Sequence, residues 1–175
     1  FKLLGILFDT KLNMTEDVDD VISRARPKIK ALSRTRNFYS IAEFMIQFKM
    51  HIWGLVEFHT PALFHCPPSL LSKVDRLQVS FLEHLGISEE EALLTYNFAP
   101  FKTRRDIVML GFLYKIAHGQ AHPGFNTIFP SAPAQEGRHN KQLGDHAGRI
   151  SFRFQLWRRS VFCLVAYFNR LPQHV

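Results

Sequence analysis

The chain has 175 residues, of which 46% are hydrophobic, and its formal net charge is +7 at pH 7. This length favours one domain or two small subdomains, and the 17 phenylalanines supply bulky side chains for a packed core. The excess of positive charge points to anionic partners, with nucleic acid ahead of an anionic membrane surface. The only cysteines, Cys66 and Cys163, lie far apart, which argues against a disulfide framework and fits a reducing intracellular location, nuclear or cytoplasmic.

No apolar run reaches the length of about 20 residues that a membrane-spanning helix needs, so the sequence predicts no membrane partner. The predicted fold class is mainly α, with a short N-terminal β-hairpin, a helical bundle, and a C-terminal helix after a flexible loop. The predicted boundaries are a hairpin over 1–14, a helical bundle over 15–129, a flexible loop over 130–149 and a basic helical element over 150–175.

The first 14 residues carry apolar side chains on both parities, as in a short strand that is covered on both faces. Gly5 interrupts this strand, which suggests a bulge or a close approach of another backbone. Polar residues from Asp9 to Asn13 provide turn chemistry, and residues 11–14 are a candidate return strand. Since a lone hairpin is marginal in water, we expect residues 1–14 to close a sheet that begins upstream in a larger protein.

Apolar residues recur at helical spacing between Thr15 and Thr35, with Thr15 as a candidate N-cap and acidic residues near the positive end of the helix dipole. Arg26, Lys30 and Arg34 follow at intervals of four residues, so they project together beside the apolar stripe; we call them the basic ridge. Such a ridge can lie along a phosphate backbone. A solvated helix face is the alternative, and both interpretations stay open at this point.

Further helices are predicted from their caps and apolar spacing. Ser40 and Glu43 form a capping box for a helix that runs to about residue 59, before Pro61. Another helix begins after a Pro-Pro-Ser sequence at 67–69 and ends at Gly86. A short acidic helix follows, in which the glutamates of the first turn are explained by the helix dipole more simply than by acid–base chemistry.

A helix is predicted from an N-cap at Thr103 through residue 118, with Lys102, Arg104 and Arg105 at its beginning. Cations at a helix N-terminus oppose the dipole. A bound anion would relieve this conflict, because free backbone N–H groups and both arginines would converge on it. In the alternative, the arginines pair with nearby acids such as Asp106.

The last part of the chain carries a second group of cations. Residues 130–149 lack periodicity and are rich in Pro, Ala, Gly, His and Gln, which predicts the flexible loop. A helix is expected over about 157–169, after a strand-like alternation at 152–154. Arg158 and Arg159 are the candidate binding residues in this element.

Two histidine-containing groups are candidates for catalytic or metal sites. His59, His65 and Cys66 provide three ligands without a fourth at a suitable spacing, which does not support a zinc site. The sequence at 138–146 loosely resembles an HNH nuclease motif, but the strands that frame such a motif are not predicted. We therefore assign no catalytic and no metal-binding residues.

Two motifs resemble a known family. The pattern at residues 1–9, Phe-Lys-x-Leu-Gly-x-x-Phe-Asp, is followed by a basic helix and resembles the segment after the polymerase palm in reverse transcriptases of non-LTR (LINE-type) retrotransposons. Residues 169–172, Asn-Arg-Leu-Pro, resemble the Asn-x-Leu-Pro that closes many of these polyproteins, although Phe168 stands where the family usually has Trp.

The resemblance implies a function for each region. Leu4 and Gly5 match the primer grip, and the following helices match the thumb and post-thumb regions, which hold RNA and RNA–DNA duplex without strong sequence preference. The family's paired aspartates and their Mg²⁺ belong to the upstream palm, so this chain carries no cofactor and is not expected to be catalytic by itself; palm and fingers of the same polyprotein are expected partners. The alternative is a helical protein-interaction domain from a decayed or co-opted retroelement.

Overall fold

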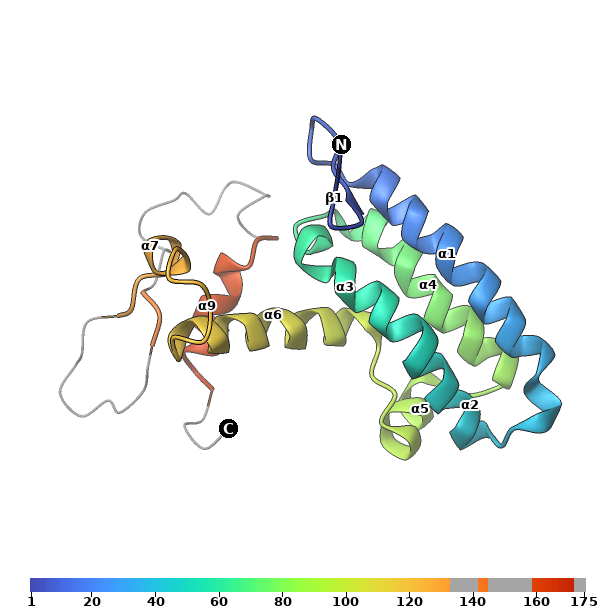
Figure 1. Ribbon diagram of the computed structural model, residues 1–175. Coiled ribbons are helices and arrows are strands. Elements are labelled where there is room, and N and C mark those ends of the chain that lie inside the picture. The colour runs from blue at the N-terminus through green and yellow to red at the C-terminus, as the bar shows by residue number, and fades with distance from the viewer. Residues whose placement is uncertain (133–141, 145–158, 172–175) are drawn as a thin grey trace. The chain divides into compact units, whose positions relative to one another are not determined.

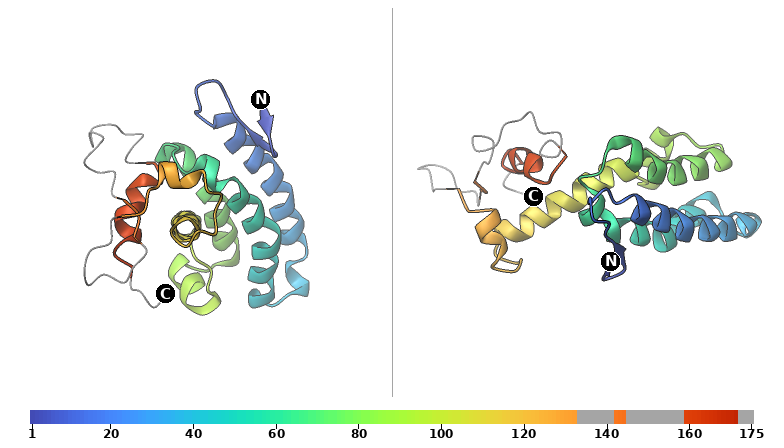
Figure 2. Two further views of the ribbon diagram at one scale, coloured as in Figure 1. Left: turned by 60° about the vertical axis from the view of Figure 1, so that its left-hand side comes forward. Right: turned by 90° about the horizontal axis from the view of Figure 1, so that it is seen from above.

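The structure, a computed structural model, describes residues 1–132, 142–144 and 159–171. These residues are mainly helical and begin with a two-stranded antiparallel hairpin (Figure 1, Figure 2), which confirms the predicted fold class. The chain consists of two compact units, Phe1–Arg105 and Asp106–Val175. Their boundary falls inside helix α6 (Phe101–Ala117), where an unbroken helical pattern leaves no linker signal in the sequence.

The hairpin is tighter than the sequence predicts. Strands β1 (Lys2–Leu3) and β2 (Ile6–Leu7) are joined by Leu4 and Gly5, whose φ angles are 50° and 90°. Two central residues with positive φ are the signature of a type I′ turn, whose twist matches that of the flanking strands. The pairing register is Lys2↔Leu7 and Leu3↔Ile6. Gly5 therefore forms the turn itself, where the sequence suggested a bulge within one strand.

Residues 11–14, the candidate return strand, form a loop around Asp9 instead. The Asp9 carboxylate accepts hydrogen bonds from the backbone N–H groups of Lys11, Asn13 and Met14 at 2.8–3.0 Å. These bonds lower the pKa of Asp9, and the bond from Asn13 contributes most. Because the loop's backbone donors are bound to one carboxylate, they are not available for a strand ladder.

Helix α1 (Thr15–Arg34) follows at once and has the predicted length. Its N-cap is Met14, in the left-handed conformation with φ 58°, so Thr15 is the first helical residue and not the cap. The buried face of the helix includes Val18, Val21 and Ala25. Pro27 stays inside the helix at an exposed position away from the buried face, where its missing N–H removes one backbone hydrogen bond.

The next three elements form one continuous rod. The predicted capping box of Ser40 and Glu43 is present and opens α2 (Ile41–Phe48). A π-helical turn, η2 (Lys49–Trp53), then leads into α3 (Gly54–Leu63). The rod runs past Pro61, where an end was predicted, because this proline falls in the last turn and removes only one backbone hydrogen bond there.

Helices α4 (Pro68–Leu85) and α5 (Glu89–Tyr96) complete the first unit together with the start of α6. Gly86 ends α4 with φ 72°, as predicted for a left-handed C-cap. Ser88 accepts a hydrogen bond from the backbone of Glu91 and caps α5. Helix α6 begins at Phe101, two residues before the predicted start, so Thr103 lies in the first turn and is not the cap.

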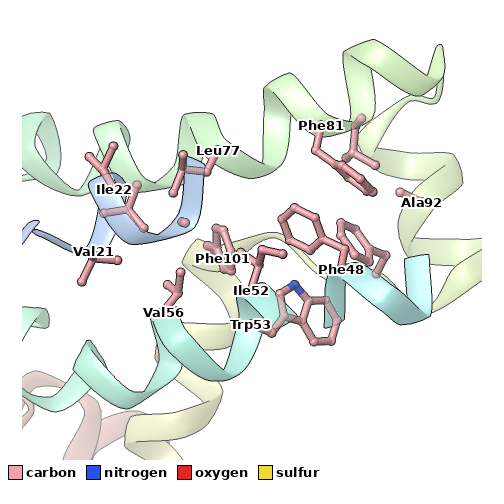
Figure 3. Packing of buried hydrophobic residues seen from close by; sticks show 14 of the residues in the cluster. Val21, Ile22, Phe48, Ile52, Trp53, Val56, Leu77, Phe81, Ala92 and Phe101 are labelled. Atoms are coloured by element: carbon pink, nitrogen blue, oxygen red, sulfur yellow. The ribbon is translucent and has the colours of Figure 1, made fainter. Parts of the chain in front are cut away.

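Aromatic side chains fill the core of the first unit. Phe48 packs against Phe81 with ring centroids 4.3 Å apart (Figure 3). It also contacts Phe98, at a centroid distance of 5.3 Å. Phe44 and Phe101 extend the same cluster. Since these rings come from α2, α4 and α6 and from the segment before α6, one cluster joins the bundle across its width.

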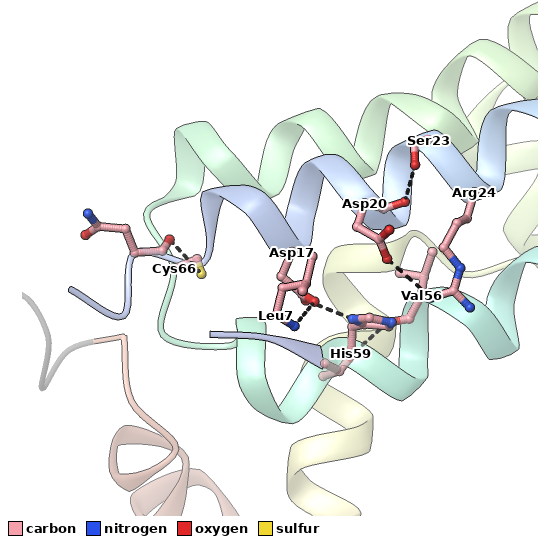
Figure 4. Close-up of polar contacts among 10 residues, drawn as sticks. Leu7, Asp17, Asp20, Ser23, Arg24, Val56, His59 and Cys66 are labelled. Carbon is pink, nitrogen blue, oxygen red and sulfur yellow. Dashed lines mark hydrogen bonds and ion pairs between the residues drawn. The ribbon is translucent and has the colours of Figure 1, made fainter. Parts of the chain in front are cut away.

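Asp17 connects the hairpin to two helices (Figure 4). Its Oδ1 atom accepts a hydrogen bond of 2.8 Å from the backbone N–H of Leu7 in β2. Its Oδ2 atom lies 2.8 Å from Nδ1 of His59 in α3, and both side chains are almost fully buried. Because Nδ1 faces a carboxylate, we place a proton on this nitrogen, which then donates to Asp17.

The second unit is built around the rest of α6, with helices α7 (Phe125–Ile128) and α9 (Phe162–Phe168). Its core contains Leu113, Ile116, Phe129, Leu143 and Val165. A bridge pairs Ser131 with Leu143 in antiparallel fashion. Predictions that concern residues 133–141, 145–158 and 172–175 lie outside the described residues.

Asn169, the first residue of the Asn-x-Leu-Pro motif, has a structural role in this unit. Its Oδ1 atom accepts from the backbone N–H of Leu143 at 3.1 Å, and its Nδ2 atom donates to the Leu143 carbonyl at 2.9 Å. The side-chain amide therefore pairs with Leu143 as a neighbouring strand would.

Among the described residues, no helix combines the length and the apolar character that a membrane crossing requires.

Replacing Asp17 by Ala should lower the free energy of unfolding by about 3–5 kcal/mol, because His59 and the Leu7 N–H would lose their partner in a buried site. Urea denaturation of the whole chain measures this change. Glu16→Ala, on the exposed side of the same turn, should cost less than about 1 kcal/mol. Equal effects of the two substitutions would contradict the role of Asp17.

Replacing Asn169 by Ala should destabilise the second unit by about 2 kcal/mol, because its side chain would no longer form the two hydrogen bonds to Leu143. Hydrogen exchange of the Leu143 amide in the whole chain should become faster. Asn126→Ala, an exposed position in α7, is the control and should leave this exchange rate unchanged. Unaltered protection of Leu143 in the Asn169 variant would refute the pairing.

Candidate nucleic-acid interface

A groove runs between α1 and α4 in the first unit. We call it the α1–α4 groove; its volume is about 940 Å³. The two helices are parallel, since Asp19 lies near Lys73 toward their beginnings and Arg36 donates to the His84 carbonyl at their ends (Figure 1). The lining residues are Asp19, Ile22, Ser23, Arg26, Ile29, Lys30, Ser33, Lys73, Arg76, Leu77, Ser80, Phe81 and His84.

The apolar stripes of the two helices explain the position of the groove. Ile22 of α1 and Leu77 and Phe81 of α4 are buried where the helices meet. Residues that flank each stripe by a fraction of a turn must then lie on the walls above this contact. Cations occupy several of these flanking positions, so hydrophobic packing between the helices also brings cations of both helices to the walls of one groove.

The walls of the groove are predominantly cationic. Arg26 and Lys30 come from α1, Lys73 and Arg76 come from α4, and all four side chains line the groove. Asp19 is the single carboxylate among the described lining residues. Cations on both walls, with one carboxylate among the described lining residues, favour a ligand with several negative charges.

The basic ridge predicted from the sequence forms part of this wall. Arg26 and Lys30 line the groove, and Arg34 continues the ridge one turn farther without lining it. None of the three has an ion pair or side-chain hydrogen bond with another described residue. The ridge is thus open to a ligand, while its phosphate contact stays a prediction.

The other cations of this region do have partners. Arg24 pairs with Asp20 at 3.3 Å, and Lys28 donates to the backbone carbonyl of His51 at 3.4 Å. Arg36 donates to the carbonyl of His84 at 2.9 Å. The six basic residues between positions 24 and 36 therefore divide into three with protein acceptors and three that form the ridge.

Sequence reasoning missed Lys73 and Arg76. Their spacing of three residues on the polar face of a predicted helix is a signal that was available. The sequence does not tell which helix packs beside this face, because local periodicity does not specify tertiary neighbours.

Arg104 and Arg105 are engaged within the protein, as the alternative interpretation held, although with different acids. Arg105 is 6% exposed, and its guanidinium forms a two-pronged ion pair with Asp75 at 2.5 and 3.0 Å. Arg104 pairs with Glu57 and lies over the Trp53 ring at 3.6 Å. Carboxylates from α3 and α4 thus neutralise the charge at the start of α6, where the sequence suggested a bound anion.

Lys49, in the π-helical turn, belongs to the same cluster. Its ammonium donates to the Tyr96 carbonyl at 2.7 Å and lies 5.3 Å from the centre of the Trp53 ring. Burial lowers the pKa of Lys49, and the positive charge of Arg104 lowers it further. These contacts hold α5 and α6 against the rod, so we assign the cluster a structural role.

Leu4 and Gly5, the predicted primer-grip residues, form the tip of the hairpin. The Leu4 side chain is 83% exposed. Its backbone has a positive φ, a conformation that costs a non-glycine residue about 1–2 kcal/mol. A Cβ atom added to Gly5 would lie 3.8 Å from the Phe58 ring, an ordinary contact, so the positive φ and not crowding requires glycine here. The tip is accessible, and its contact with a primer stays a prediction.

The remaining predicted positions can be placed briefly. Arg158 lies outside the described residues, and Arg159 is half-buried with contacts inside the protein. The three residues weighed as zinc ligands each contact a different partner. His59 forms a hydrogen bond with Asp17, and His65 forms one with the Leu12 carbonyl at 2.9 Å. Cys66 contacts the Asn13 carbonyl at 3.8 Å.

Comparison with models of protein families, with curated proteins and with solved structures gives no match for this chain.

Replacing Arg105 by Ala should lower the free energy of unfolding by about 3 kcal/mol, because Asp75 would keep a charge without its partner. Arg105→Lys should recover only part of this loss, since an ammonium lacks the planar fork that binds both carboxylate oxygens. Urea denaturation measures both values. A loss below about 0.5 kcal/mol for Arg105→Ala would mean that the pair does not stabilise the fold.

Proposed function

We propose that the chain binds nucleic acid through the phosphate backbone, with the α1–α4 groove as the binding surface. The observation that carries this proposal is the basic ridge, whose three cations have no acceptor among the described residues, together with Arg76 on the opposite wall of the groove. Phosphates would supply the missing acceptors, and release of their counterions would drive binding.

The groove favours recognition of the backbone over recognition of bases. Apart from Asp19, its charged groups are exposed, flexible cationic side chains, which suit phosphates and carry no sequence information. Phe81, the one aromatic residue among the described lining groups apart from His84, is buried and therefore offers no ring on which a base can stack. Binding should therefore be sensitive to salt and tolerant of sequence.

We further propose that this chain is the primer-grip, thumb and post-thumb part of a LINE-type reverse transcriptase. The motif at residues 1–9 and the Asn-x-Leu-Pro at 169–172 support this assignment, as does the succession of a tight hairpin and a helical bundle with a basic face. In this role the groove holds RNA–DNA duplex, Leu4 and Gly5 approach the primer end, and catalysis belongs to the Mg²⁺-bearing palm upstream.

A helical protein-interaction domain is the second candidate. It is favoured by exposed apolar side chains before the rod, in its π-helical turn and on α5: Phe38 is 82% exposed, Met50 67% and Leu94 75%. Large exposed apolar groups are typical of surfaces that bind proteins. Dependence of duplex affinity on salt separates the two candidates.

Replacing Arg26, Lys30 and Arg34 together by Gln should weaken binding to a labelled RNA–DNA duplex. The slope of log affinity against log salt should become shallower by up to about 2.7, because each phosphate that is no longer neutralised accounts for about 0.9. Fluorescence anisotropy across a salt series measures the slope, and circular dichroism verifies folding.

The matched control replaces Lys11, Arg24 and Lys28 by Gln, which removes the same charge from residues outside the groove. This control should retain most of the slope. Equal losses in both variants would indicate a general effect of net charge, and an unchanged slope in the ridge variant would favour the protein-interaction candidate.

A further inference from the structure

We propose that Asp19 bounds the α1–α4 groove by competing with phosphate for Lys73, so that the nucleic-acid strand bound in the native protein ends short of this lysine. This inference rests on the proposed function and adds a residue that limits the length of the binding site.

The geometry places Asp19 at one end of the groove. Its Oδ1 atom lies 3.9 Å from the Lys73 ammonium, and both residues line the groove. The Lys73 and Asp19 side chains are 48% and 62% exposed, so solvent and ligands reach the pair. Arg26 and Arg76 are the next cations along the α1 and α4 walls, and no described carboxylate lines the groove beyond them.

Asp19 should deter a strand in two ways. A phosphate that reaches Lys73 must displace the carboxylate, although exposed ion pairs are worth only about 0–1 kcal/mol. The displaced carboxylate then remains close to the phosphate and repels it. No such opposition exists at Arg26, Lys30 or Arg76, where a described acidic partner is lacking.

The dimensions give the size of the effect. From Arg76 to His84, α4 rises about 12 Å, which corresponds to between three and four phosphates of one strand. From Lys73 to Arg76 it rises about 4.5 Å more, or about one phosphate. Removing the charge of Asp19 should therefore allow the protein to neutralise about one more phosphate.

Asp20 provides a matched control. It is the next residue on the same helix and pairs with Arg24 at 3.3 Å, but neither member of this pair lines the groove. Asp19→Asn and Asp20→Asn change the net charge equally, and both leave a cation without its carboxylate. Only the first releases a cation inside the groove.

Asp19→Asn should bind the labelled RNA–DNA duplex about three- to fivefold more tightly at moderate salt, with a slope steeper by about 0.9. Asp20→Asn should leave the slope unchanged. Lys73→Gln should alter the affinity of the native protein little, and it should abolish the gain when combined with Asp19→Asn. This last result would assign the gain in duplex affinity to Lys73 and not to the overall electrostatic field of the protein.

Three outcomes would overturn the proposal: no gain in Asp19→Asn, equal gains in the Asp19 and Asp20 variants, or a gain that persists without Lys73. If any of these occurs while the ridge variant still loses its salt dependence, the proposed function stands and only the role of Asp19 falls. If the ridge variant also keeps the full slope, both proposals fall.

Discussion

The buried carboxylate of Asp17 is the constraint on which the arrangement of the first unit depends. A carboxylate removed from water needs hydrogen-bond donors in a fixed geometry, and here the donors come from two distant parts of the chain, the backbone of Leu7 and the ring of His59. One side chain of α1 thereby sets the position of the hairpin and of α3. The hairpin, which would be marginal alone, gains a specific anchor.

This constraint allows α1 to perform different tasks on its different faces. Its inner face is closed by apolar packing and by Asp17, so it has one orientation in the bundle. The outward cations then separate according to their surroundings: Arg24 and Lys28 find acceptors in the protein, whereas the basic ridge faces the groove and its margin. If α1 could rotate about its axis, the cations with protein acceptors and the cations of the basic ridge would not keep their separate surroundings.

Local signals predict most of the helices. Apolar periodicity, the capping box of Ser40 and Glu43 and the glycine after α4 all correspond to features of the structure. The π-helical turn was not predictable because no sequence rule for it exists at the level of caps and periodicity. The same is true of the start of α6, where partners distant in sequence neutralise an unfavourable pair of arginines.

The candidate site was also predictable only where local signals specify it. The ridge follows from spacing within one helix, but the opposite wall depends on the packing of α4 beside α1, which the local pattern does not specify. Asp17 belongs to the acids of the first turn, which are explained from the sequence by the helix dipole. Its position four residues before Val21 and eight before Ala25 places it on the buried stripe, a signal that identifies it as an interior group.

The parallel course of α1 and α4 has a thermodynamic consequence. The rod of α2, η2 and α3 separates these helices along the chain, so the two walls of the groove come together only when the bundle folds. A polyanion that touches both walls would bind the native state and not the unfolded chain. Occupancy of the groove would then raise the melting temperature with ligand concentration, which links folding of this unit to the presence of its ligand.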